Sequence, residues 1–167
     1  MRADILLMAL ILGMDRAVKA LIPRLLEIHQ SIPVIPGFFR ITHIRNTGGA
    51  FGILADWDSP VRQVFFIFVS IAALVILFLL YRQAVKDNLR SLRLSLVFIA
   101  GGAMGNLYDR IATGEVVDFL DFFIGRHHWP AFNVADISIF IGAVFLAWLF
   151  LTGRAHPEGK PSFPDAP

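Results

Sequence analysis

The stretch VDFLDFFIGRHHWPAFNVADIS, residues 117–138, places three aspartates and one asparagine among aromatic side chains. It leads directly into a hydrophobic segment that runs to Leu151. Ionisable groups at membrane depth cost free energy and, where they are found, usually mark a functional site. Asp118, Asn133 and Asp136 are therefore candidate site residues, provided that other segments bring polar groups to the same place.

The composition is that of an integral membrane protein. Hydrophobic residues make up 56% of the 167 residues and charged residues 17%, with a mean hydropathy of +0.66. An ordinary soluble domain is less apolar and more charged. The chain has no cysteine, which excludes disulfides, thiolate metal ligands and a cysteine nucleophile. It has no basic run interleaved with aromatics, so we expect no nucleic-acid partner.

Four segments are predicted to form transmembrane helices within a single domain, residues 1–152. They lie at about residues 3–22, 61–81, 94–111 and 133–151. Each has about the 20 residues that a helix needs to cross the hydrocarbon core. The first is a poor signal peptide, because charged residues follow its apolar run where a small-residue cleavage site belongs. The tail, residues 153–167, is rich in proline and glycine and is predicted to be disordered.

Two longer connections are predicted to carry the non-helical structure. The first, residues 23–60, contains turn signals and the partly alternating FFRITHIRN (38–46), which favours a short hairpin or small sheet. The second alternates acids with phenylalanines, which suits a stretch lying in the bilayer interface. The expected fold class is an all-α membrane protein: a four-transmembrane-helix bundle with a small extracytoplasmic β-type segment and an interfacial loop.

The short connection 82–93 sets the expected orientation. It carries four basic residues against one acid, so the positive-inside rule places it in the cytoplasm, together with both termini. The polar ends of the first and third helices then meet the start of the fourth at the outer mouth of the bundle. The side chains collected there by the first and third helices are Asp15, Lys19, Asn106 and Arg110.

Asp15 and Lys19 stand four residues apart, so on a helix they share a face and can form an ion pair. For Arg16 we expect a solvated position where the helix leaves the membrane. Asn46 and Gly48 lie in a glycine-rich segment that suits a tight turn or a close backbone approach to a ligand.

Two aspartates near each other at a low dielectric constant would share a proton, because the pKa of one carboxyl rises. Such a pair supports peptide hydrolysis by water without a metal. From spacing alone, structural roles are as well supported as catalysis: Asp136 as an acid that caps the fourth helix after Asn133, and Asp118 as a solvated loop acid. His127 and His128 lack a third ligand at a spacing suitable for zinc.

The chain contains no HExxH, GxSxG or GxGD motif, which separates it from other kinds of membrane protease. A different class remains open: a small proton-coupled transporter or channel subunit in which Asp15, Asp118 and Asp136 relay protons. That function needs polar residues along a path through the whole bilayer. The second helix and the inner halves of the third and fourth offer almost none, so a protease is favoured.

Five blocks, in order along the chain, closely resemble the signature blocks of bacterial lipoprotein signal peptidase, signal peptidase II. They are MDRAVK (14–19), RNTGGAFG (45–52), GGAMGNLYDR (101–110), EVVDFLDF (115–122) and WPAFNVADISI (129–139). The resemblance implies an aspartic endopeptidase whose catalytic dyad is Asp118 and Asp136, with no metal and no cofactor. It also assigns site-ordering and substrate-contacting roles to further residues: Asp15, Lys19, Asn46, Gly48, Asn106, Arg110 and Asn133.

The resemblance further implies where the protein acts and on what. We expect a monomeric multi-pass enzyme of the bacterial inner membrane, with its active site on the periplasmic side. Its substrates would be membrane-embedded prolipoproteins, cut just before the cysteine that already bears diacylglycerol. Two features depart from the family pattern: Arg16 stands where glutamine is usual, and the stretch between Asp118 and Asp136 is one residue shorter than in some members.

Overall fold

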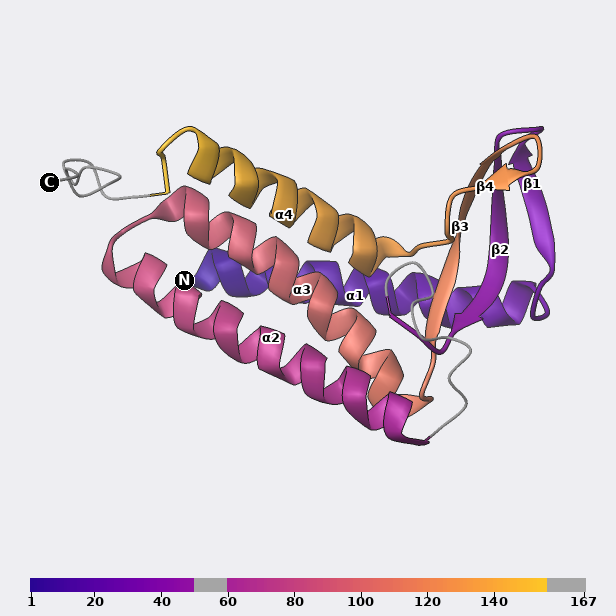
Figure 1. Cartoon of the computed structure of the whole chain (residues 1–167), viewed down its shortest axis with the longest axis horizontal. Helices are drawn as coiled ribbons and strands as arrows, with labels where there is room; N and C mark the ends of the chain where they lie inside the picture. The colour runs from indigo at the N-terminus through magenta and orange to yellow at the C-terminus, as the bar shows by residue number, and fades with distance from the viewer. Residues whose placement is uncertain (50–59, 156–167) are drawn as a thin grey trace, which may run out of the picture.

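The computed structural model describes residues 1–49 and 60–155. Most of the predicted disordered tail lies outside the described residues, as does the glycine of the first connection at position 52. The described chain is mostly helical, with one small antiparallel sheet at the end of the bundle, where α1 extends alongside it (Figure 1).

Four long helices run side by side (Figure 1). They are α1 (Arg2–Leu25), α2 (Pro60–Lys86), α3 (Arg90–Ala112) and α4 (Val134–Leu151). Helix α3 contacts each of the other three and forms the centre of the bundle. The predicted ranges lie within these helices, except that Asn133 is the N-cap of α4 rather than its first residue.

Small residues on α3 allow its neighbours to approach closely. A Cβ at Gly101 would lie 3.1 Å from Ile11 Cγ2 on α1, and one at Gly105 would lie 2.5 Å from Asp15 Oδ2. A Cβ at Gly102 would overlap the carbonyl oxygen of Ala135 on α4. Gly101 and Gly105, four residues apart, thus form a small-xxx-small contact, which brings the polar side of α1 against α3.

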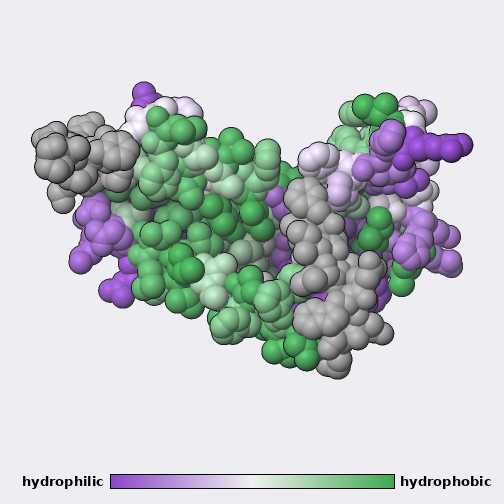
Figure 2. Space-filling view, in the orientation of Figure 1, coloured by the Kyte–Doolittle hydropathy of each residue, from purple (hydrophilic) through white to green (hydrophobic). Residues whose placement is uncertain are grey.

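The outer surface of the bundle is apolar. Figure 2 shows a hydrophobic belt over the helices, with hydrophilic residues gathered at the sheet and at the opposite end. Large hydrophobic side chains are exposed on all four helices. A belt of this kind would be unfavourable in water and is suited to lipid. By length and hydropathy, two helices of the described chain qualify as spans, Val61–Lys86 and Val134–Leu151.

The four strands form one antiparallel array in the order β1-β2-β3-β4. They are β1 (Ser31–Ile35), β2 (Phe39–Asn46), β3 (Val116–Ile124) and β4 (His127–His128). The predicted hairpin of the first connection is confirmed by the pairing of β1 with β2.

The second connection contains two strands, β3 and β4, so the prediction that it is a loop is wrong, while its location at the bilayer interface stays a prediction. Residues Val116–Ile124 pair with β2, in a register that sets Asp118 opposite Ile44 and Asp121 opposite Arg40. The acids lie three residues apart, which is not the period of two of a strand; the strand signal here is the richness of the segment in valine, phenylalanine and isoleucine. The all-α class therefore holds for the bundle only, since the second connection completes the sheet.

Candidate active site

Asp118 enters the site from β3 and is buried, with 3% of its surface exposed. Its Oδ1 accepts a hydrogen bond from Asn133 Nδ2 at 2.7 Å, and its Oδ2 accepts one from Asn46 Nδ2 at 3.1 Å. The interpretation of Asp118 as a solvated loop acid is therefore wrong. Burial, assisted by the nearby charge of Asp136, raises the pKa of Asp118 to about 7, although both amide hydrogen bonds oppose the rise.

Asp136 occupies the third position of α4 and forms the predicted capping box with Asn133. The Asp136 backbone N–H donates to Asn133 Oδ1 at 3.0 Å, and Asp136 Oδ2 accepts from the Asn133 backbone N–H at 3.1 Å. Its second oxygen, Oδ1, accepts from Asn106 Nδ2 at 2.7 Å. Asp136 is thus a helix-capping acid that also faces a side chain of α3.

Asn133 joins the two carboxyl groups. Its side-chain amide donates to Asp118, while its backbone N–H donates to Asp136. The residue is fully buried, so water does not compete for these hydrogen bonds. One asparagine at the start of α4 therefore holds carboxyl groups from a strand and a helix at the same place.

Behind the carboxyl pair lies a buried polar network between α1 and α3. Lys19 Nζ lies 2.9 Å from Asp15 Oδ2, 2.8 Å from Asp109 Oδ2 and 2.8 Å from Asn106 Oδ1. The predicted ion pair of Asp15 and Lys19 is confirmed. Asp15 Oδ1 also accepts from the Ala135 backbone N–H at 3.0 Å, which ties α1 to the first turn of α4.

Arg110 and Asn46 hold the chain that follows β2. Arg110 Nη2 donates to the Gly48 carbonyl oxygen at 3.1 Å, and the Gly48 N–H donates to Asn46 Oδ1 at 2.9 Å. The Arg110 guanidinium also lies 5.4 Å from the centre of the Phe66 ring on α2. Asn46 contacts Asp118 from this segment, so all nine predicted site residues belong to one connected network.

Two residues of this network, Arg16 and Asp109, were not among the predicted site residues. The Arg16 guanidinium pairs with Asp109 and lies 4.2 Å from the centre of the Tyr108 ring. Arg16 is only partly solvated, contrary to the expectation: its side chain is 31% exposed and its guanidinium is held by Asp109, 93 positions away on α3. The one local signal was the spacing of Asp109 three residues after Asn106, which places the two on one face of a helix.

Asp121 lies apart from this network although it shares β3 with Asp118. Its carboxylate pairs with Arg40 Nε at 2.6 Å and with His128 Nδ1 at 2.9 Å. In residues 1–49 and 60–155, no group of three or more histidine, cysteine or acidic side chains could hold a metal ion.

Two solved structures of bacterial membrane enzymes, both determined by the in meso method, share this fold. One superposes with a TM-score of 0.80 at 33% identity, over 98% of this chain and 96% of the other. The second has a TM-score of 0.75 at 36% identity, over 90% of this chain and 94% of the other. The described fold is therefore that of a membrane enzyme.

The sequence comparisons identify the family. Residues 7–152 match the family described as Signal peptidase (SPase) II. The lipoprotein signal peptidase of Desulforapulum autotrophicum is 51% identical over 144 residues, which cover 86% of this chain and 88% of that protein. That of Geobacter metallireducens is 48% identical over 139 residues, covering 83% and 84%. The chain belongs to the signal peptidase II family.

Proposed function

We propose that this protein is an aspartic endopeptidase that removes the signal peptide from diacylglyceryl-modified prolipoproteins, just before the lipidated cysteine. The observation that carries the proposal is the pair of carboxyl groups, Asp118 and Asp136, each hydrogen-bonded to Asn133, which is fully buried. Family membership supports the substrate class, and the geometry of the two carboxyl groups supports the aspartic mechanism.

The dyad would work in a singly protonated form. Because the pKa of Asp118 is raised to about 7, a large share of this carboxyl is protonated in neutral solution and can donate its proton toward the scissile carbonyl oxygen. The ionised Asp136 then takes a proton from the attacking water, and the protons pass to the leaving amine as the intermediate collapses. No covalent intermediate is needed.

The amides around the dyad fix its orientation. Asn106 donates to Asp136, whereas Asn46 and Asn133 donate to Asp118. A carboxyl oxygen that already accepts a hydrogen bond has a fixed direction, so the reacting atoms need less reorganisation in the transition state. Arg110 would act on substrate through the Gly48 segment that it holds.

We further propose that all four helices span the bilayer in a monomeric enzyme of the bacterial inner membrane, with both termini cytoplasmic. Asp15 and Lys19 on α1 and Asn106 and Asp109 on α3 lower the hydropathy of these helices, but all four are buried, so neighbouring helices shield them from lipid. The dyad then lies at the periplasmic end, next to the sheet. A substrate with a transmembrane signal helix and acyl chains would present its scissile bond at that boundary.

Reporter fusions test this orientation. We expect fusions at Asp87, in the basic connection between α2 and α3, to report the cytoplasm, and fusions at Arg126, between β3 and β4, to report the periplasm. The same side for both positions would refute the four-span arrangement.

The dependence on lipid modification tests the substrate class. Acyl chains anchor the substrate in the bilayer and lower the entropic cost of positioning the scissile bond. We expect purified protein to process a diacylglyceryl-modified prolipoprotein with a kcat/KM at least about tenfold above that for the unmodified precursor. Gel-shift assays of the two forms measure this ratio, and equal turnover would contradict the proposed substrate.

A further inference from the structure

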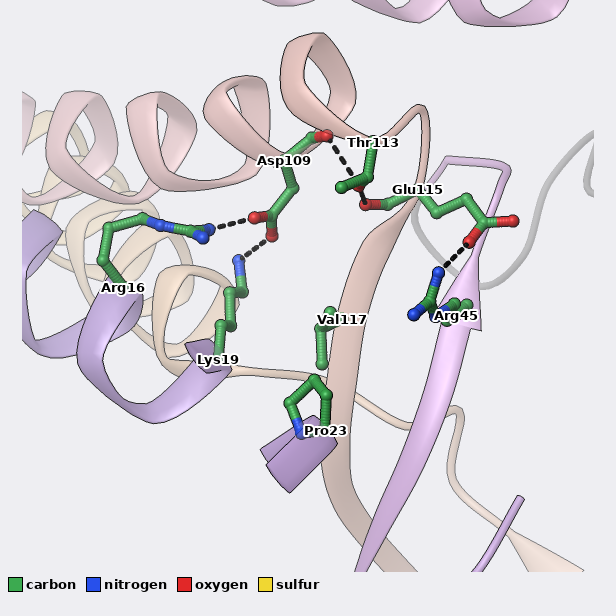
Figure 3. A pocket seen from close by; sticks show the side chains of 8 residues that line it. All are labelled: Arg16, Lys19, Pro23, Arg45, Asp109, Thr113, Glu115 and Val117. Carbon is green, nitrogen blue, oxygen red and sulfur yellow. Dashed lines mark hydrogen bonds and ion pairs between the residues drawn. The ribbon is translucent and has the colours of Figure 1, made fainter. Parts of the chain in front are cut away.

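Four charged side chains form a compact cluster between α1 and α3, next to the dyad. The side chains of Asp15 and Lys19 are fully buried, Asp109 is 5% exposed and Arg16 is 31% exposed. Arg16 and Lys19 both reach the Asp109 carboxylate from α1 (Figure 3). Two acids and two bases make the cluster neutral.

The cluster borders a cavity of about 150 Å³ on one side and the dyad on the other. Arg16, Lys19 and Asp109 line the cavity together with Val117, the residue that precedes Asp118 on β3 (Figure 3). Arg16 is the one member of the cluster with substantial exposure, so it meets water from the cavity while the other three charges stay shielded.

A continuous set of contacts leads from the cluster to Asp136. Lys19 Nζ donates to Asn106 Oδ1 at 2.8 Å, and Asn106 Nδ2 donates to Asp136 Oδ1 at 2.7 Å. An amide oxygen held by an ammonium group leaves the NH₂ on the opposite side, so the position of Lys19 determines which end of Asn106 faces the dyad. Asp109 in turn holds Lys19 at 2.8 Å.

We propose that Asp109 and Arg16 are a positioning pair for the dyad: Asp109 holds Lys19, and so Asn106, in place, while Arg16 keeps the cluster neutral. This inference rests on the proposed function. Neither residue touches Asp118 or Asp136, so both act through their neighbours.

If the charges of Asp109 and Arg16 matter, removing either one should shift the pH dependence of processing, which a role in packing alone would not do. The charged groups around the dyad come from α1 (Asp15, Arg16, Lys19), from α3 (Asp109, Arg110), and from the more distant pair of Arg45 on β2 and Glu115 before β3. Asp109→Asn leaves one extra positive charge in this set, and Arg16→Gln leaves one extra negative charge. A positive charge favours the ionised dyad and a negative charge the protonated one.

The test is the pH profile of prolipoprotein processing for the two single variants and for Arg16→Gln combined with Asp109→Asn. We expect the alkaline fall in kcat to move down by about 0.5–1 pH unit in Asp109→Asn and up by a similar amount in Arg16→Gln. The neutral double variant should return close to the wild-type midpoint. Asp109→Asn should also lower kcat about tenfold with little change in KM, whereas Arg16→Gln, which installs the residue usual in the family, should keep most of the activity and move only the midpoint.

Arg40→Gln provides the matched control. It removes the charged partner of Asp121, a buried acid on the sheet, and leaves the four-residue cluster unchanged. Its processing profile should keep the wild-type midpoint. Unmoved midpoints in both single variants, or shifts in the same direction, would overturn the inference. If Asp109→Asn fails to fold, Arg16→Gln and the double variant still decide the outcome. A wild-type protein that cuts no prolipoprotein would instead refute the proposed function.

Discussion

Asp118→Asn and Asp136→Asn should each abolish prolipoprotein processing, with a fall in kcat of at least about 1000-fold. Asparagine matches aspartate in shape and keeps one acceptor oxygen, but it cannot take up and release a proton. At position 136 it can still accept the hydrogen bond from the Asn133 backbone N–H that completes the capping box. The loss should therefore occur without a loss of folding.

Asp121→Asn is the matched control for the dyad. This aspartate is as buried as Asp118 and lies on the same strand, but its partners are Arg40 and His128. We expect processing to stay within about threefold of wild type, while the thermal midpoint falls because Arg40 loses a charged partner. Wild-type processing by the 118 or the 136 variant would refute the aspartic assignment.

The same experiment separates catalysis from helix capping. If Asp136 served only as a cap, Asp136→Asn would leave processing and the thermal midpoint nearly unchanged, since asparagine is tolerated in the first turn. Loss of processing at an unchanged or raised midpoint indicates that the carboxyl acts chemically, because removal of one of two neighbouring acids relieves repulsion and desolvation.

Local sequence signals were sufficient for the helices and for the start of the site. Long apolar runs determine where α2 and α4 lie, and the order Asn133 to Asp136 determines the capping box, because both depend on neighbouring residues only. The ion pair of Asp15 and Lys19 follows from their spacing on one helix.

Local signals failed where long-range contacts decide. The stretch Val116–Ile124 reads equally well as an interfacial segment and as a strand, and its pairing with β2, about 70 residues earlier, selects the strand. The partner of Arg16 was missed for the same reason, because no residue near Arg16 in the sequence indicates that it pairs with Asp109. The bridging role of Asn133 is likewise visible only once β3 and α4 are brought together.

Processing should fall as the pH rises above about 7, because the proposed active form of the dyad carries one proton and the pKa of Asp118 is raised to about 7. Well above that pKa each further pH unit reduces the protonated fraction about tenfold, so kcat at about pH 9 should be about fiftyfold below its value at about pH 7, where half of the carboxyl is protonated. The rate at which a diacylglyceryl-modified precursor is cleaved, measured from about pH 5 to about pH 10, tests this expected decrease in kcat. A rate that stays flat to the upper limit would contradict a proton held on Asp118.

Stability gives an independent measure of the same proton. Between the model-compound pKa of 3.8 and about 7, the folded protein holds a proton on Asp118 that the unfolded chain has lost. The unfolded state then binds fewer protons, so this group's contribution to stability falls as the pH rises through that window, by at most about 1.4 kcal/mol per unit. Asp118→Asn removes the dependence, so it should raise the thermal midpoint relative to wild type at about pH 8 and leave it nearly unchanged at about pH 4. If the variant is no more stable than wild type at the higher pH, burial does not destabilise the charged form of Asp118 and the argument for a raised pKa fails.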